Sequence, residues 1–132
     1  MARRLKILVA EDDENDFLFL QCMLKNAGVA YLYQVKDGED AMAYLAGKDP
    51  FSNRSTYPFP DILLLDLKLP KISGHEILES LSPAAELRPA RIYVLSGSDL
   101  DEDRARAGRA GADDYFVKPL CLGHLAVLFK AD

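Results

Sequence analysis

The sequence predicts a doubly wound α/β fold, in which one parallel five-stranded sheet lies between two layers of helices. Short aliphatic runs without polar alternation are typical of strands that are buried on both faces. A segment with helical spacing or capping residues follows each run, and this pattern occurs five times. Most connections are short, so the strands must run parallel and be joined by right-handed crossovers.

The first strand is expected at Leu5–Ala10, where an aliphatic run leads into acidic residues. A helix follows over Glu14–Asn26, and Gly28 is typical of the residue that ends a helix. Asp13 and Glu14 are interpreted as a solvated helix start, where negative charge favours the helix dipole. Helical spacing predicts one buried stripe on this helix. The stripe comprises Phe17, Leu20, Gln21 and Leu24.

The second strand is expected at Ala30–Val35, and Asp37-Gly38 is a turn signal. A short helix is predicted over Glu39–Ala46. The segment Gly47–Pro60 is rich in prolines and small polar residues. It predicts a long loop of the kind that is usually functional or mobile.

The third strand is the most apolar. Ile62–Leu65 are four consecutive aliphatic residues that run into Asp66. Pro70 cannot donate a hydrogen bond to a sheet, so the chain must leave the sheet before it. Asp66 is therefore expected at the carboxyl end of a central strand, where open α/β sheets place their ligand sites.

Five further elements complete the pattern. They are helix Gly74–Leu81, strand Arg91–Ser96, helix Leu100–Ala110, strand Tyr115–Val117 and helix Cys121–Lys130. Ser73 and Glu76 predict a capping box at the first of these helices. Asp99 is a candidate cap for the second.

Composition and charge exclude several classes of function. The net charge of -5 argues against non-specific nucleic-acid binding, which needs a basic face. No apolar stretch approaches the roughly 20 residues that cross a bilayer, so no membrane association is expected. Cys22 and Cys121 lack metal-ligand spacing, and two free thiols indicate a cytoplasmic protein. The length predicts a single domain over residues 1–132.

Reactive side chains follow the predicted strand ends. Glu11 and Asp12 follow the first strand, Asp66 the third, Ser96 closes the fourth, and Lys118 follows the fifth. Carboxylates that converge in one crevice cannot all stay ionised without a compensating cation. Their oxygens suit Mg²⁺, whereas the lysine and the hydroxyl indicate that an anion also binds. A phosphoryl group attached to one carboxylate meets both requirements.

This set resembles the receiver (response regulator) domain of bacterial two-component signalling. The resemblance covers the chain from Leu5 to the last helix, and several short motifs in order make it specific. They are Glu11-Asp12, Leu65–Pro70, Gly74, Ser96-Gly97, Gly111–Tyr115 and Lys118-Pro119. The resemblance implies the flavodoxin-like strand order 2-1-3-4-5.

The resemblance also implies roles for the acidic residues. Asp66 would accept a phosphoryl group from the phosphohistidine of a histidine kinase or phosphotransfer protein, and would contribute to the metal site. Asp12 would bind Mg²⁺ directly, Glu11 would bind it through water, and the Lys68 backbone carbonyl would complete the protein ligands. The chain would be a signalling phosphoacceptor that catalyses only its own phosphorylation and dephosphorylation, not an enzyme.

Three more residues take roles from the family. Ser96 would hydrogen-bond a phosphoryl oxygen, and Lys118 would pair with another. Tyr115 would change rotamer as Ser96 moves inward, which would switch a protein-binding surface. The family also often has a cis bond before the proline, so Lys118-Pro119 can be cis.

The long loop at Gly47–Pro60 resembles stand-alone receivers that partner bacterial phytochromes. We therefore expect a histidine kinase as partner, with a phytochrome-type kinase as a candidate, and a downstream protein target. No output domain is expected after the last helix. The charged helix Leu100–Ala110 is compatible with a homodimer held by salt bridges and also with a solvated helix face, so the oligomeric state stays open.

Several residues lie outside these motifs. Three apolar residues on the first helix are hypothesised to form a kinase docking face: Phe19, Cys22 and Met23. Lys68 is predicted to influence the lifetime of the acyl phosphate, and Ser98 is a weaker candidate for the same role. His75 and His124 are interpreted as surface residues.

Three other functions compete with this interpretation. Phosphatases of the haloacid dehalogenase type carry a second Asp two residues after the nucleophile, where this chain has Lys68, so their general acid is missing. A flavodoxin-like cofactor site needs a phosphate loop after the first strand, where Glu11 and Asp12 would repel phosphate. A receiver-like adaptor that works without phosphorylation stays open as the alternative.

Overall fold

The computed structural model describes residues 3–130 and contains one parallel sheet with the strand order β2-β1-β3-β4-β5. The strands are β1 (Arg3–Ala10), β2 (Val29–Val35), β3 (Ile62–Leu65), β4 (Arg91–Ser96) and β5 (Asp114–Val117). The predicted fold class and strand order are confirmed. Ala10 is paired with Val35 on one side and Leu65 on the other. The carboxyl ends of β1, β2 and β3 therefore lie at one edge of the sheet.

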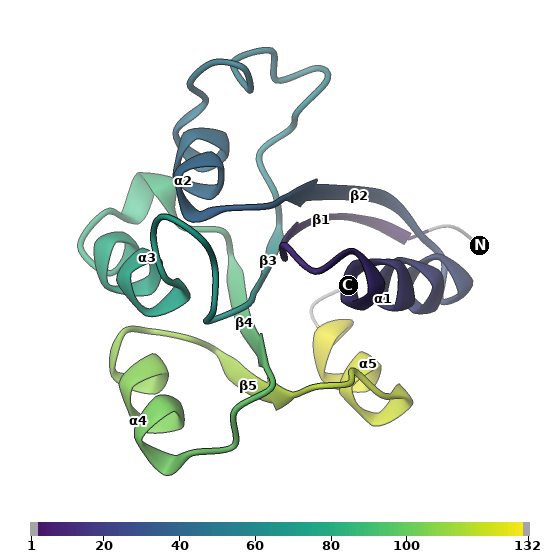
Figure 1. Cartoon of the computed structure of the whole chain (residues 1–132). Helices are drawn as coiled ribbons and strands as arrows, with labels where there is room; N and C mark the ends of the chain where they lie inside the picture. The colour runs from purple at the N-terminus through teal and green to yellow at the C-terminus, as the bar shows by residue number, and fades with distance from the viewer. Residues whose placement is uncertain (1–2, 131–132) are drawn as a thin grey trace.

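Two layers of helices cover the sheet. The helices are α1 (Glu14–Asn26), α2 (Gly38–Ala46), α3 (Gly74–Leu81), α4 (Asp101–Arg109) and α5 (Leu122–Leu128), with a 3₁₀ turn at Ala85–Leu87. Helices α1 and α5 lie on one face, and α2, α3 and α4 lie on the other (Figure 1). Within residues 3–130, none of the helices has the length and apolar character that crossing a membrane requires.

Side-chain caps fix where three of these helices begin. Asp13 accepts a hydrogen bond from the backbone of α1, and Asp37 does the same for α2. The capping box predicted at Ser73 and Glu76 is present at the start of α3. Each cap satisfies a backbone N–H that has no partner inside its helix.

The structure corrects several predicted boundaries. Asp99 does not cap α4, because its carboxylate accepts two hydrogen bonds from Arg104 instead. Strand β1 begins two residues earlier than Leu5, and α5 is shorter than Cys121–Lys130 at both ends. Gln21 is only partly buried, unlike the three apolar residues of its predicted stripe.

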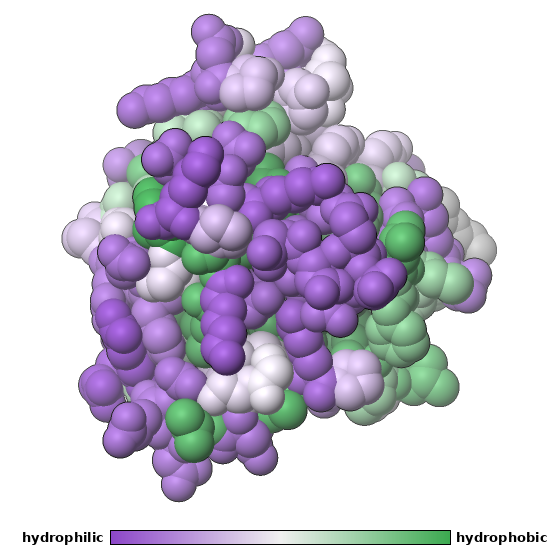
Figure 2. Space-filling view, viewed as in Figure 1, coloured by the Kyte–Doolittle hydropathy of each residue, from purple (hydrophilic) through white to green (hydrophobic). Residues whose placement is uncertain are grey.

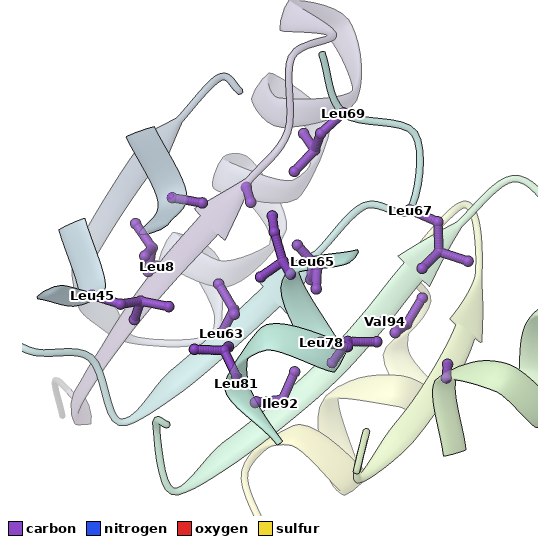
Figure 3. Close-up of a cluster of buried hydrophobic side chains, with 14 of the residues drawn as sticks. Leu8, Leu45, Leu63, Leu65, Leu67, Leu69, Leu78, Leu81, Ile92 and Val94 are labelled. Carbon is purple, nitrogen blue, oxygen red and sulfur yellow. The ribbon is translucent and has the colours of Figure 1, made fainter. Parts of the chain in front are cut away.

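The core divides into two clusters, one on each face of the sheet. Alternate residues of β3 serve the two faces: Leu63 and Leu65 pack beneath α2 and α3, whereas Ile62 and Leu64 pack beneath α1 and α5. Figure 3 shows the first cluster, with leucines of β1, β3 and α3 pointing toward one another. A strand that is covered on both faces has no polar position, which explains the unbroken aliphatic run of β3.

Gly74 places α3 directly against the loop that follows β3. A Cβ added to Gly74 would lie 2.4 Å from the backbone oxygen of Asp66 and 2.7 Å from the Cα of Leu67. Real Cβ atoms do not approach other atoms so closely, so only glycine fits without moving the Asp66 backbone. The contact with α3 therefore fixes the backbone position of Asp66, the candidate phosphoacceptor.

The segment Gly47–Pro60 forms an ordered loop that projects from the end of α2 (Figure 1). The guanidinium of Arg54 donates hydrogen bonds to the backbone oxygens of Tyr44, Leu45 and Tyr57. Rings of Tyr44, Phe51 and Tyr57 pack against one another, with centroids 5.2–6.0 Å apart. These contacts hold the loop against α2 and against the main core on that face of the sheet.

Candidate functional site

Three carboxylates meet where β1 and β3 end. One oxygen each of Glu11, Asp12 and Asp66 lies within 4.8 Å of the others. The pairing of Ala10 with Leu65 brings these residues together, and the Asp66 backbone N–H also donates to the Ala10 oxygen at 3.1 Å. Glu11 and Asp66 are buried, whereas Asp12 is exposed. A cluster of carboxylate oxygens, open on one side, fits a hard divalent ion such as Mg²⁺.

The Lys118 ammonium bridges this acidic cluster. Its Nζ lies 2.5 Å from Glu11 Oε1, 3.1 Å from Asp66 Oδ2 and 2.9 Å from Asp16 Oδ2. The backbone N–H of Lys118 donates to the Ser96 oxygen at 2.7 Å, which ties the end of β5 to β4. The Lys118-Pro119 peptide bond is cis, as the resemblance allowed.

One ammonium does not fully compensate the crowded acids. Burial is the largest influence on Glu11, and with the neighbouring Asp66 it outweighs the Lys118 hydrogen bond and raises the pKa of Glu11 to about 7. Burial also opposes the charge of Lys118, but the hydrogen bonds that its ammonium donates to Glu11 and Asp16, together with the charge of Asp66, outweigh burial and raise the pKa of Lys118. Buried carboxylates that crowd one ammonium raise both pKa values, and such a cleft favours a further cation.

Asp16 is a member of the cluster that the sequence analysis missed. Its position in the first turn of α1 is typical of a helix-start acid, and its ion-pair partner Lys118 is 102 residues away. Asp13 lies outside the ammonium contacts and instead caps α1 by accepting from the Asp16 N–H at 2.9 Å. The interpretation of Asp13 as part of a helix start is thus confirmed.

Asp66 is oriented by its own loop. Its Oδ1 accepts from the Lys68 backbone N–H at 3.0 Å, so its Oδ2 is left to face Lys118. The Lys68 side chain is exposed and forms no ion pair within residues 3–130. The backbone of Lys68 thus lies beside the acceptor carboxylate, where the resemblance expects a metal ligand.

Ser96 is the buried hydroxyl of the site. Its Oγ accepts from the Ser98 backbone N–H at 3.1 Å. A hydroxyl that accepts one hydrogen bond retains its own proton for a second partner. The Tyr115 hydroxyl donates to the Ser98 backbone oxygen at 2.8 Å, and the guanidinium of Arg104 lies 4.8 Å from the centre of the Tyr115 ring. Tyr115 is therefore buried and turned toward the loop after β4.

The surface prediction for His75 is wrong. His75 is 7 % exposed, and its Nε2 lies 3.0 Å from Oδ1 of Asp103 on α4. It has a partner that sequence spacing could not show, because the two residues are 28 positions apart. His124 is partly buried and stacks on Phe116, with ring centroids 4.5 Å apart.

An apolar surface lies beside the acidic cleft, over α1 and α5. Figure 2 shows hydrophobic residues gathering on that side, next to the hydrophilic centre of this face. Phe19 and Leu122 are 50 % and 77 % exposed. A cavity of about 380 Å³ joins Phe19 to Lys118, and a second of about 390 Å³ joins Phe19 to Cys22 and Met23. Cys22 and Cys121 are exposed free thiols.

Comparison with known proteins identifies the family. A family model described as a response regulator receiver domain matches residues 7–130. The phosphate regulon transcriptional regulatory protein PhoB of Klebsiella pneumoniae is 34% identical over 131 residues, which cover 99% of this chain and 52% of PhoB. The chain therefore spans about half the length of that relative.

Two similar crystal structures are of response regulators. The phosphorylated cyanobacterial phytochrome response regulator RcpA is 31% identical, with a TM-score of 0.81 over 98% of this chain and 91% of RcpA. The Mn²⁺-bound form of Rcp1 is 29% identical, with a TM-score of 0.79 over 96% of this chain and 90% of Rcp1. The predicted similarity to phytochrome-associated response regulators is confirmed. Because the family model covers nearly the whole chain, the protein belongs to the response regulator receiver domain family.

Proposed function

We propose that this protein is a phosphoacceptor of a two-component phosphorelay, in which Asp66 takes a phosphoryl group from the phosphohistidine of a kinase. The observation that carries the proposal is the contact of one buried carboxylate with both an ammonium and two further acids at the strand ends. An Asp66 oxygen forms a bond to phosphorus, and the bond from phosphorus to the kinase imidazole nitrogen breaks. The imidazole leaves with the electron pair of that bond and takes up a proton.

The divalent ion would be held by Asp12 and Asp66, by Glu11 through water, and by the backbone oxygen of Lys68. When bound, Mg²⁺ supplies positive charge against the phosphoryl oxygens. The crystal structure of the Mn²⁺-bound form of the similar response regulator Rcp1 supports the binding of a divalent ion at this site. The pKa of Glu11, which is raised to about 7, also supports a cleft that needs more positive charge.

Two polar groups would hold the transferred phosphoryl group. Lys118 already lies 3.1 Å from Asp66 and would exchange this contact for one with a phosphoryl oxygen. Ser96 would donate its free hydroxyl proton to another oxygen, because its Oγ already accepts from Ser98. Donors that are in place before the reaction stabilise developing charge without reorganisation. The signal would then pass from Ser96 to Tyr115 and the surface around α4 and β5.

Uptake of label from acetyl phosphate in Mg²⁺ tests the assignment of the acceptor. Wild-type protein should become labelled, and Asp66→Asn should fall to background because its amide cannot form the acyl phosphate. Asp13→Ser is the matched control, since it removes a nearby acid but retains a residue that caps helices. Equal labelling of Asp66→Asn would overturn the proposal. A wild-type protein that takes up no label would favour the phosphorylation-independent adaptor.

The apolar surface over α1 and α5 is proposed as the kinase docking face. Its exposed Phe19 lies on the rim of the same cavity as Lys118, so a partner seated there would reach the acceptor. Phe19→Glu should slow transfer from a phosphorylated kinase at least tenfold, yet leave labelling by acetyl phosphate unchanged. Unaltered transfer from the kinase would remove the docking role. The similarity to RcpA supports a phytochrome-type kinase as the first partner to assay.

A further inference from the structure

A hydrogen-bonded relay joins α3 to the site through α4. His75 Nε2 contacts Asp103 Oδ1 at 3.0 Å, and the other carboxylate oxygen of Asp103 accepts from Ser98 Oγ at 2.6 Å. The Ser98 backbone N–H in turn donates to Ser96 Oγ at 3.1 Å. The relay therefore begins on a buried imidazole and ends on the buried hydroxyl of Ser96 at the end of β4.

The chemistry of each member sets the direction of the relay. A carboxylate can only accept, so the proton between His75 and Asp103 belongs to Nε2 of the imidazole. Both oxygens of Asp103 are used, one on each side, so an amide in its place could accept only one of the two bonds. The hydrogen bond from Ser98, followed by that from His75, lowers the pKa of Asp103, which keeps it ionised in its accepting role.

The attachment of α4 shows why these bonds are needed. Ala107 is the only residue between Asp101 and Arg109 that is buried, so α4 has little apolar contact with the sheet. A second polar contact joins the same helices one turn further on, where Arg106 donates two hydrogen bonds to Glu79 at 2.9 Å. That contact is exposed and does not reach Ser98. The relay through Asp103 connects α3 with the loop after β4.

We propose that His75 and Asp103 are positioning residues for Ser96 in the phosphoryl-transfer reaction. They hold Ser98 so that its N–H occupies one side of Ser96 Oγ, which directs the hydroxyl proton of Ser96 toward the phosphoryl group. This inference rests on the proposed function. It also explains why His75 is buried between α3 and α4 although its Nδ1 has no hydrogen-bond partner within residues 3–130. The proposed role needs only the Nε2 atom, which contacts Asp103.

The test compares substitutions that retain or remove the donor at the Nε2 position. His75→Gln retains an N–H donor at about that reach, whereas His75→Met fills similar space without one. The rate of labelling by acetyl phosphate should fall about tenfold in His75→Met, the effect of losing one well-placed hydrogen bond. It should be largely restored in His75→Gln. Glu79→Ala is the control, because it loosens the same pair of helices without touching the relay, and its rate should match wild type.

A double-mutant cycle separates positioning from simple stability. In a Ser96→Ala background the relay has no hydroxyl to position, so adding His75→Met should cause no further loss. A tenfold loss that persists in Ser96→Ala, or an equal loss in Glu79→Ala, would overturn the inference. Should His75→Met fail to fold, Asp103→Asn and Ser98→Ala are expected to give the same pattern, and wild-type rates in both would overturn it. Absence of labelling in the wild-type protein would instead refute the proposed function itself.

Discussion

Helices α1 and α4 both flank the candidate site, but they are attached to the sheet in different ways. Helix α1 buries Phe17, Leu20 and Leu24 in the core. Helix α4 buries only Ala107, and it is held by charged pairs with α3 and by contacts with the loop after β4. The difference shows how two helices beside one cleft can be attached by different forces. We call the α1 side, which is held by apolar packing, the fixed side, and the α4 side, which is held mainly by polar contacts, the movable side. Apolar packing holds α1 beside the acidic cluster. Polar contacts hold α4, and such contacts can be replaced by contacts with water at a lower cost in free energy than buried apolar contacts.

The largest expected effect breaks the fixed side. Leu24→Ala should lower the free energy of unfolding by about 3 kcal/mol, because it removes a fully buried side chain and leaves a cavity. Ala107→Gly on α4 should cost only about 1 kcal/mol, mainly through helix propensity. Urea unfolding of the two variants measures both values. Equal losses would show that the two helices are attached with similar strength.

The next effect tests the charges of the fixed side. Lys118→Met keeps the aliphatic stem but removes the ammonium that contacts Glu11, Asp16 and Asp66. Labelling by acetyl phosphate should fall about 100-fold, a loss typical of removing one preorganised charge-stabilising group. Lys36→Met is the control, because it breaks an exposed ion pair with Glu14 on α1, the helix that also carries Asp16. A fall of less than threefold would contradict the role of Lys118.

Metal binding should stabilise the same side. With Mg²⁺ at 100 times its Kd, the free energy of unfolding should rise by about 2.7 kcal/mol, since the ion binds only the folded protein. Asp12→Ala should abolish this rise, because Asp12 is the exposed member of the carboxylate cluster. Thermal unfolding with Mg²⁺ and with EDTA measures the difference. An unchanged rise in Asp12→Ala would place the ion elsewhere.

The smallest effect concerns the movable side. Arg104→Leu removes the guanidinium that lies 4.8 Å from the centre of the Tyr115 ring and that donates two hydrogen bonds to Asp99. At exposed sites a ring contact and an ion pair each contribute about 0.5 kcal/mol, so urea unfolding should shift only slightly. Arg109→Leu, on the same helix but without a ring contact among residues 3–130, serves as the control. A loss above about 2 kcal/mol would mean that α4 is anchored through Arg104 rather than through α3.

The elements with strong local signals were predictable. Unbroken apolar runs gave the strands, the Ser73 capping box was where the residue types indicated, and the sheet topology places Asp66 beside Glu11. These features depend on residues that are close in sequence or on general rules of parallel sheets. The roles assigned to Ser96, Lys118 and Tyr115, the single-domain organisation and the homodimer stay predictions.

Pairs of distant residues could not be predicted. Asp16 and His75 each look ordinary in sequence, and each finds its partner only when separate helices or strands are brought together. Asp99 failed as a cap because α4 begins one residue too late for it, at Asp101, and because Arg104, five residues onward, pairs with its carboxylate. The order within the long loop depends on Arg54 reaching three backbone oxygens, which no spacing rule describes.

The close approach of Gly74 to the Asp66 backbone has a consequence for mutational scanning. Any larger residue at position 74 must displace the main chain that carries the acceptor, although its side chain takes no part in the chemistry. A saturation screen scored only on signalling output would therefore rank this glycine beside the aspartate. Measuring abundance in parallel would separate the two, because the damage at position 74 begins with geometry.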